Sequence, residues 1–402
     1  MAAATLPHER VLTRISDAEL ERRWAAVRKG MASRKIDAIV LQNSSDWVGG
    51  YVRWFNDVPA TNGYPKTIVF HAKEPMTVVE MGPFGARRDL GGKDQLQRGV
   101  GLALGSPSFV SCVQTQSYDA DLVVADLASR GYKNIGLIAP GYLPHALVSG
   151  LKDNLPAGTK FTDVTDWIDE IKAVKSAEEI ALIKKCAKVQ DQVFSHVLEV
   201  IKPGMRDIDV TAAAQAEGLR LGSEQGIFLG ASAKVGVRSP FAPRFMQGRK
   251  LSKGDHLSLL IEINAAGGMY TEIARTIVLG KASQELKDGF AAVKAAQTYS
   301  LSLMKPGVAP AQIAEAHDVY MKKNGMPPEL RIYAHGQGYC MVERPLIRRD
   351  ETMKLAADMN LAVHPGYETP SIFAVICDNY LVTETGISPC LHKTKKQVFE
   401  VG

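Results

Sequence analysis

Two glutamates on either side of a glycine pair are the first residues that could do chemistry. Glu262 lies in the apolar run LSLLIEINA, Gly267 and Gly268 form a corner, and Glu272 follows in MYTEIART. If the flanking runs pair as a hairpin, both carboxylates can point into one cleft. Burying such a pair is costly unless a metal, a shared proton or a cation such as Arg275 compensates. The alternative is a surface hairpin with solvated glutamates.

Two histidines and a cysteine follow. His335 lies in AHGQG, where the glycines leave room for close approach of a ligand. His364 follows the apolar run LAV, and Cys377 lies within AVICDNYLV. Each also has a structural interpretation, as a hydrogen-bonded histidine or as a small core hydrophobe. With Glu262 and Glu272 the three would suit Zn²⁺ or another borderline metal.

These side chains also suit acid–base catalysis without a metal. His335 and His364 titrate near neutral pH, and Glu262 and Glu272 could orient them or take the proton themselves. Such a set can abstract a proton and expel a leaving group, as a lyase does, or hydrolyse a C–N bond. The candidates for binding the substrate near this set are Arg275, Arg244, Arg344, Tyr270 and Cys377. If a metal is bound, the predicted ligands are Glu272, His335, His364 and Cys377.

An aromatic segment in the first half is a second candidate for binding a small organic molecule. The segment DWVGGYVRWFNDVPATNGYPKT is rich in aromatic rings and carries one arginine. Aromatic faces beside an arginine suit an aromatic or cationic substrate. The alternative is a packed loop between two strands. The candidate residues are Trp47, Arg53, Trp54, Phe55 and Tyr64.

Composition excludes several classes of protein. The 402 residues predict two domains, and the net charge of +5 is scattered, which gives no case for nucleic acid. The five cysteines are odd in number and widely spaced, as in a reducing compartment. The N-terminus is charged where a signal peptide needs an apolar core, and no apolar run is long enough to span a membrane. We therefore expect a cytoplasmic protein.

The pattern of apolar residues predicts two architectures along the chain. A helix over 16–36 and strands at 37–41, 67–70, 76–81 and 134–140 indicate an α/β domain over residues 1–165. Ser176 and Glu179 form a capping box that opens a long helix ending at KPGM. Helices and antiparallel strands follow, which predicts an α+β domain over residues 166–402.

Five phrases of the second half resemble, in order, the motifs of the pita-bread family of creatinase, prolidase, aminopeptidase P and methionine aminopeptidase. They are DWIDEIKAVKSAEEIALIKKCAKVQD, GRKLSKGDHLSLLIEINAAGGMYTEIART, AHGQGYCMVERP, LAVHPGY and ICDNYLVTETG. The resemblance covers about residues 15–400. It implies a creatinase-like N-terminal domain and a pita-bread catalytic domain.

The metal-ligand positions of the peptidases are altered in this sequence. Leu260 stands where they have an aspartate, and Glu262, two residues on, is the candidate substitute. The hairpin carries one extra residue compared with the peptidases, an arrangement that resembles the dimethylsulfoniopropionate lyase branch. Glu272 replaces the second aspartate and His335 matches the family histidine. The remaining changes are Val342 for a further histidine, and His364 and Cys377 for the two late glutamates.

The residues that creatinase uses without a metal are also changed. Pro243 or Arg244 stands near the position of its histidine base, and Ala274 and His364 stand near its two glutamates. Neither known chemistry carries over intact.

The resemblance therefore predicts a non-peptidase enzyme that cleaves one bond in a small metabolite, with a preference for a lyase reaction over metal-free C–N hydrolysis. The alternatives are a mononuclear, Xaa-Pro peptidase-like metallohydrolase and a catalytically silent binding module. We expect no cofactor, with a single Zn, Mn or Fe ion as the alternative. We also expect a homodimer in which the aromatic segment reaches the partner's active site.

Overall fold

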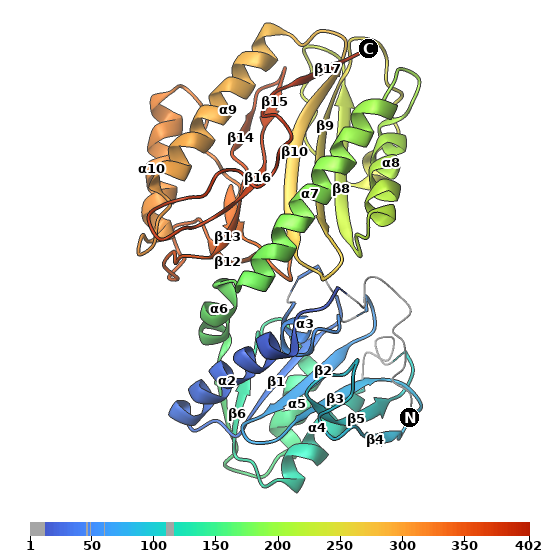
Figure 1. Ribbon diagram of the computed structural model, residues 1–402, viewed down its shortest axis with the longest axis vertical. Helices are drawn as coiled ribbons and strands as arrows, with labels where there is room; N and C mark the ends of the chain where they lie inside the picture. The colour runs from blue at the N-terminus through green and yellow to red at the C-terminus, as the bar shows by residue number, and fades with distance from the viewer. Residues whose placement is uncertain (1–12, 46, 49, 60, 110–115) are drawn as a thin grey trace. The chain divides into compact units, whose positions relative to one another are not determined.

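The chain is described here from a computed structural model. The structure describes residues 13–402, apart from 46, 49, 60 and 110–115. It divides into two compact units, one over Ile15–Lys172 and the other over Ala173–Gly402 with the segment that ends at Arg14 (Figure 1). The division lies within helix α6 (Thr165–Ala173), a few residues beyond the predicted boundary at 165.

The unit Ile15–Lys172 is built on a seven-stranded sheet with the order β4-β5-β3-β2-β1-β6-β7. Successive residues of a strand point to opposite faces, and Ala38 and Val40 of β1 pack in one apolar cluster with helices α4 (Tyr118–Ser129) and α5 (His145–Asn154). The predicted strands are confirmed, whereas the sequence pattern does not indicate β4, β5 and β7. The strands are β1 (Ala38–Asn43), β2 (Lys66–His71), β3 (Met76–Met81), β4 (Arg87–Asp89), β5 (Val100–Ser106), β6 (Asn134–Leu137) and β7 (Lys160–Asp163).

Two further helices of this unit precede its second strand. Helix α2 (Asp17–Arg34) begins at Ser16, whose hydroxyl accepts a hydrogen bond from the backbone N–H of Glu19 at 3.1 Å. Helix α3 (Tyr51–Asn56) contacts β1 and β2. The aromatic segment predicted as a binding loop is thus partly helical.

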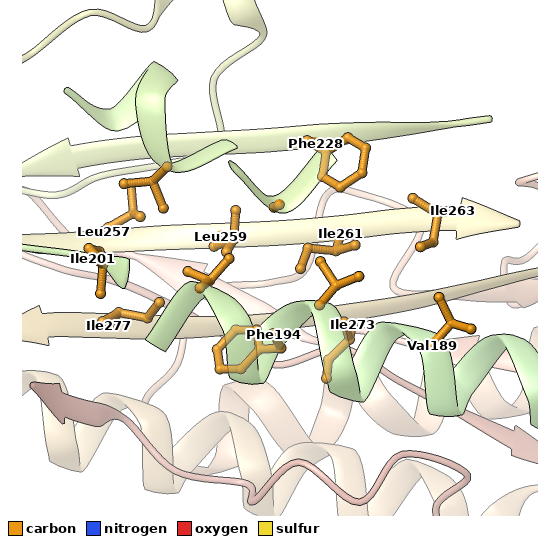
Figure 2. Close-up of a cluster of buried hydrophobic side chains, with 14 of the residues drawn as sticks. Val189, Phe194, Ile201, Phe228, Leu257, Leu259, Ile261, Ile263, Ile273 and Ile277 are labelled. Atoms are coloured by element: carbon orange, nitrogen blue, oxygen red, sulfur yellow. The ribbon is translucent and has the colours of Figure 1, made fainter. Parts of the chain in front are cut away.

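The second unit opens with helix α7 (Ala177–Val200), and the predicted capping box of Ser176 and Glu179 is present. This helix and α8 (Asp207–Arg220) cover a sheet with the order β17-β10-β9-β8. Figure 2 shows the apolar core between them, to which β9 contributes Leu257, Leu259, Ile261 and Ile263. The strands are β8 (Gly226–Ala233), β9 (His256–Asn264), β10 (Tyr270–Leu279) and β17 (Phe399–Val401).

A second sheet of the same unit has the order β12-β11-β13-β16. Helices α9 (Gln284–Leu303) and α10 (Pro310–Lys323) lie on the side of the unit away from α7 and α8 (Figure 1). A bridge between Ala274 and Cys377 joins β10 to the segment before β16 and so links the two sheets. The remaining strands are β11 (Ala334–Gly336), β12 (Glu343–Leu346), β13 (Asn360–Val363), β14 (Gly366–Glu368), β15 (Phe373–Val375) and β16 (Asp378–Leu381).

The predicted α/β and α+β halves are both observed. Within the described ranges, no helix is long and apolar enough to cross a membrane.

Candidate functional site

The two glutamates face each other across a hairpin. Strands β9 and β10 are antiparallel, and Glu262 is the direct register partner of Glu272. Gly267 and Gly268 in the connecting turn have φ of +97° and +84°, which glycine adopts without strain. Both glutamates are buried, with exposed fractions of 6% and 4%. The alternative of a solvated surface hairpin is therefore wrong.

The second sheet supplies the two histidines. His335 is the middle residue of β11, and His364 follows β13. The backbone N–H of His364 donates to the carbonyl of Tyr333 at 2.6 Å, which places it beside the start of β11. The two imidazole rings meet edge to face with centroids 5.1 Å apart. His335 is buried and His364 is partly exposed, so the pair has contact with solvent.

Glu272, His335 and His364 bring three ligand atoms within 4.8 Å of one another. His335 Nε2 lies 3.6 Å from Glu272 Oε2, which is longer than a hydrogen bond. An oxygen and a nitrogen that share one tetrahedral metal, at the usual distances of about 2.0–2.2 Å, lie about 3.4 Å apart. The observed separation is close to this value.

The tautomer of His335 also fits a metal ligand. Its Nδ1 lies 2.9 Å from the carbonyl oxygen of Gly336. Because a carbonyl only accepts, Nδ1 carries a proton, which leaves Nε2, on the side of Glu272, as the ring nitrogen that can bind a cation. Backbone carbonyls hold metal-binding histidines in this way. The set of one carboxylate and two imidazoles fits a single Zn, Mn or Fe ion with open positions.

The surroundings of these side chains shift their pKa values in different directions. Burial lowers the pKa of His364 to about 4, so its imidazole is neutral at pH 7 and able to bind a cation. Burial and the neighbouring Glu272 raise the pKa of Glu262 well above its usual range. Burial would also raise the pKa of Glu272, but the nearby imidazoles of His364 and His335 and the adjacent Cys377 thiol hold it below its usual range. Without a cation, a proton shared by the glutamates therefore resides on Glu262, and a cation beside Glu272 would release this proton because an opposite charge favours the carboxylate.

Glu262 is held by an amide that sequence reasoning missed. Gln337 Nε2 donates to Glu262 Oε1 at 2.7 Å, and Asn379 Nδ2 donates to Gln337 Oε1 at 2.8 Å. Both amides are fully buried. The available signal was their spacing: Gln337 lies two residues after His335 and Asn379 two residues after Cys377, so a strand would place each on the same face as a candidate.

An apolar row lies next to the glutamates on the same face of the sheet. Across strands β8, β9 and β10, one row of register partners consists of Ile227, Glu262 and Glu272. The next row on this face, two residues along each strand, consists of Leu229, Leu260 and Ala274. Leu260 and Ala274 form an apolar cluster with Ala362 and Cys377, against which the partly buried Ile227, Leu229 and Phe241 pack. This surface has no carboxylate to hold a second cation, so the residues fit one metal and not two.

Cys377 belongs to the apolar cluster rather than to the three-residue ligand group. Its Sγ donates to the backbone carbonyl of Glu272 at 3.5 Å. Burial, with the nearby Glu272 and Asp378, raises the pKa of the thiol well above its usual range. Its Sγ is thus not among the three grouped ligand atoms, and the role of Cys377 as a ligand stays a prediction.

Arg275 does not reach the ligand group. Its guanidinium is fully buried, donates to Asp378 Oδ1 at 2.6 Å and also donates to the carbonyls of Ala274 and Cys377. The prediction that Arg275 compensates the glutamates or holds the substrate is therefore corrected. Asp378, Cys390 and His392 form a second cluster of metal-ligand types, but Asp378 already pairs with Arg275 and with Lys396 at 3.5 Å. Two cations make this cluster a poor metal site.

The other predicted substrate-binding residues of the second unit are dispersed. Arg244 is exposed in the short helix η2 (Arg244–Met246) and donates to Gln215. Arg344 pairs with Glu351 through Nε at 3.1 Å. Tyr270 is buried two residues before Glu272, on the same face of β10, and its backbone N–H donates to Gly338 at 2.7 Å. Of these three, only Tyr270 adjoins the glutamates.

The aromatic segment is split between core and surface. Trp54 and Phe55 are fully buried in the first unit, and the Arg23 guanidinium lies over the Trp54 ring at 5.4 Å. Arg53 is also buried. These three side chains are not available to a substrate, which corrects the prediction for them. Trp47 is 38% exposed and Tyr64 is partly exposed. The homodimer, and a role of this segment in it, stay predictions.

Comparison with known proteins identifies the family. Residues 181–384, just over half of the chain, match Metallopeptidase family M24, and the chain belongs to this family. It is 26% identical over 261 residues to the Xaa-Pro dipeptidase of Pyrococcus furiosus, covering 64% of this chain and 74% of that protein. It is 26% identical over 403 residues to an uncharacterized hydrolase/peptidase of Sinorhizobium fredii, covering 95% of this chain and 96% of that protein.

Solved structures confirm the predicted pita-bread fold with its N-terminal α/β domain. Dipeptidase PepE from Mycobacterium ulcerans superposes with a TM-score of 0.75 at 21% identity, covering 96% of this chain and 99% of that chain. Prolidase from Pyrococcus horikoshii gives a TM-score of 0.73 at 20% identity, covering 93% and 99%. At these identities the likeness establishes the fold alone.

The family makes this chain an M24-family hydrolase. The predicted preference for a lyase reaction finds no support in these comparisons. The relatives favour the predicted alternative, a metallohydrolase.

Proposed function

We propose that this protein is a mononuclear metal-dependent hydrolase that cleaves a C–N bond in a small substrate. The observation that carries the proposal is the group formed by Glu272, His335 and His364, with its ligand atoms within 4.8 Å. One carboxylate and two imidazoles with open positions are typical of a catalytic metal site. A bound divalent ion would supply a Lewis acid and an activated water.

The residues of this chain have separate roles in the reaction. Glu272, His335 and His364 would hold the ion. Glu262, opposite Glu272 in the hairpin, accepts the proton of the attacking water and passes it to the departing nitrogen. The water oxygen bonds to the carbonyl carbon as the C–N bond breaks, so that one water is consumed and an acid and an amine are released.

The apolar row gives the substrate an apolar group beside the scissile bond. Ile227, Leu229 and Phe241 are partly exposed, and their cluster includes Leu260, which lies in the next row to Glu262. Binding of an aliphatic or aromatic substituent would be favourable, because it removes these apolar side chains from water. A charged substituent would lose its hydration there and bind more weakly. Because the named relatives include Xaa-Pro dipeptidases, Leu-Pro and Phe-Pro are the first substrates to test.

The test is hydrolysis by the purified protein before and after its metal is removed with a chelator and restored. We expect activity that is lost with the metal and recovered with Zn²⁺, Mn²⁺ or Fe²⁺. His364→Ala should be inactive, whereas His145→Ala, an exposed histidine of the first unit, should match the wild type. Activity that survives metal removal would contradict the proposal and favour the metal-free alternative. Tight binding of Leu-Pro without turnover would favour the silent binding module.

A further inference from the structure

The hydrogen-bond directions behind the two glutamates are fixed by the backbone. The N–H of Glu272 donates to Asn379 Oδ1 at 2.7 Å. Because a backbone N–H can only donate, this contact assigns the oxygen of Asn379 and leaves its Nδ2 to donate to Gln337 Oε1. Gln337 must then present its own Nε2 to Glu262 Oε1 at 2.7 Å. The backbone of one glutamate thus sets the contact made by the side chain of its partner.

The same chain of bonds is anchored at its other end. The backbone N–H of Asn379 donates to His392 Nδ1 at 3.4 Å, so the proton of this imidazole is on Nε2, which donates to Gln190 Oε1 at 2.8 Å. Gln190 Nε2 in turn donates to the carbonyls of Ile261 and Thr271 at 3.0 and 2.5 Å. These two residues directly precede the glutamates. The network therefore starts and ends on the hairpin.

Glu262 has one oxygen engaged by this network. Its Oε1 accepts from Gln337, and no hydrogen bond from the described part of the chain reaches Oε2. Asn360 buttresses the relay, because its Nδ2 donates to the Gln337 carbonyl at 3.2 Å and its Oδ1 accepts from Asn379 at 3.3 Å. A buried amide with its partners in place holds one rotamer, whereas a broken network leaves polar groups unsatisfied.

We propose that Gln337 and Asn379 are positioning residues that hold Glu262 in one orientation, with Oε1 engaged and Oε2 available to the reacting water. The inference rests on the proposed function for the role of Glu262. That Gln337 orients the Glu262 side chain follows from the hydrogen-bond directions alone. Neither amide belongs to the group of metal ligands, so both act on the reaction through the orientation of Glu262.

The decisive variant is Gln337→Met, which keeps the length and volume of the side chain and removes the amide. With Leu-Pro as the substrate, we expect kcat to fall at least about tenfold, a part of the roughly 10²–10⁴-fold that a general base contributes. KM and the bound metal should not change. In the background of Glu262→Gln, the same substitution should change kcat by less than about twofold, because a residue that acts only through Glu262 has nothing left to position.

Equal losses in both backgrounds, or an unchanged kcat in the single variant, would overturn the proposal. A wild-type protein that binds metal but hydrolyses no dipeptide would count against the proposed function and not against the relay. Crystal structures of the wild type and of Gln337→Met then decide. We expect one Glu262 conformer in the wild type and a rotated or split one in the variant. An unchanged Glu262 in the variant would overturn the relay.

Discussion

His335 Nε2 faces Glu272 Oε2 at 3.6 Å, and the other nitrogen of the same imidazole is tied to the Gly336 carbonyl. A proton or a cation between Nε2 and this carboxylate would stabilise the pair. With His364 beside them, the two residues bring three ligand atoms within 4.8 Å of one another, a spacing that fits one metal ion. The side chains of the adjacent apolar row, Leu229, Leu260 and Ala274, offer no ligand atoms for a second ion.

Replacing Cys377 and His364 in turn should show which of the two side chains contributes to metal affinity. We expect Cys377→Ala to keep the affinity of the wild type for Zn²⁺ within a few-fold, because its thiol lies in the apolar cluster and donates to the Glu272 carbonyl. His364→Ala should weaken binding by more than about 100-fold, since even the loss of a residue that orients a ligand costs roughly 10–100-fold. Competition with a chromophoric chelator measures both. Comparable losses in the two variants would restore Cys377 as a ligand.

Arg275 should prove structural. Arg275→Met leaves Asp378 buried without its closest cation, which is expected to lower the free energy of unfolding by about 3–5 kcal/mol. Arg275→Met with Asp378→Asn should be less destabilised than Arg275→Met alone. Urea unfolding followed by circular dichroism gives the comparison. A stable Arg275→Met protein with only a raised KM would instead show that Arg275 holds the substrate.

A row of half-buried apolar side chains should set the preference for the substrate. We expect Leu229→Lys to lower kcat/KM for Phe-Pro at least about tenfold, because the ring would lose apolar surface on which to pack. The smaller Gly-Pro should be affected less, and metal content should stay the same. Steady-state kinetics on the two dipeptides make the measurement. An equal effect on both substrates would show that the row does not touch the substituent.

His317 should make the protein sensitive to acid. It is fully buried, stacks on Tyr333 with centroids 3.8 Å apart and bonds to Ser300. Burial lowers its pKa from 6.5 to about 4. As the pH falls from about 6.5 to 4, His317 therefore binds a proton in the unfolded chain but not in the folded one. The free energy of unfolding decreases over that pH range.

The contribution of His317 can be isolated by comparing two pH values. His317→Phe keeps the ring stack and removes the titration, so it should lose less stability than the wild type between pH 7.5 and 5, by on the order of 2 kcal/mol. Urea unfolding at each pH gives the difference, and His145→Ala is the matched control on an exposed histidine. Parallel losses in His317→Phe and the wild type would show that another group is responsible.

Much of the fold could be predicted from local patterns. The capping box at Ser176 and the glycine corner at Gly267 are short-range signals, and the structure contains both. The three residues of strand β4 are exposed and form no apolar run, so its sequence holds no signal of its own. Its pairing with β5 comes from tertiary contacts.

The sequence predicts which residue types form the candidate site, but not which side chains contact one another. The sequence suggests Glu262, Glu272, His335 and His364, and the structure brings them together. It cannot show that Arg275 turns to Asp378, because the partner lies about a hundred residues away in the chain. Nor can the aromatic composition around Trp54 distinguish a binding loop from a core helix, since both bury aromatic rings.

The most direct test of the account is the metal content of protein purified without added metal and then loaded with Zn²⁺, Mn²⁺ or Fe²⁺, measured by elemental analysis. We predict about one ion per chain, lost together in Glu272→Ala, His335→Ala and His364→Ala and kept in His145→Ala. Two ions per chain, or none in the loaded wild-type protein, would contradict a single metal held by these three residues.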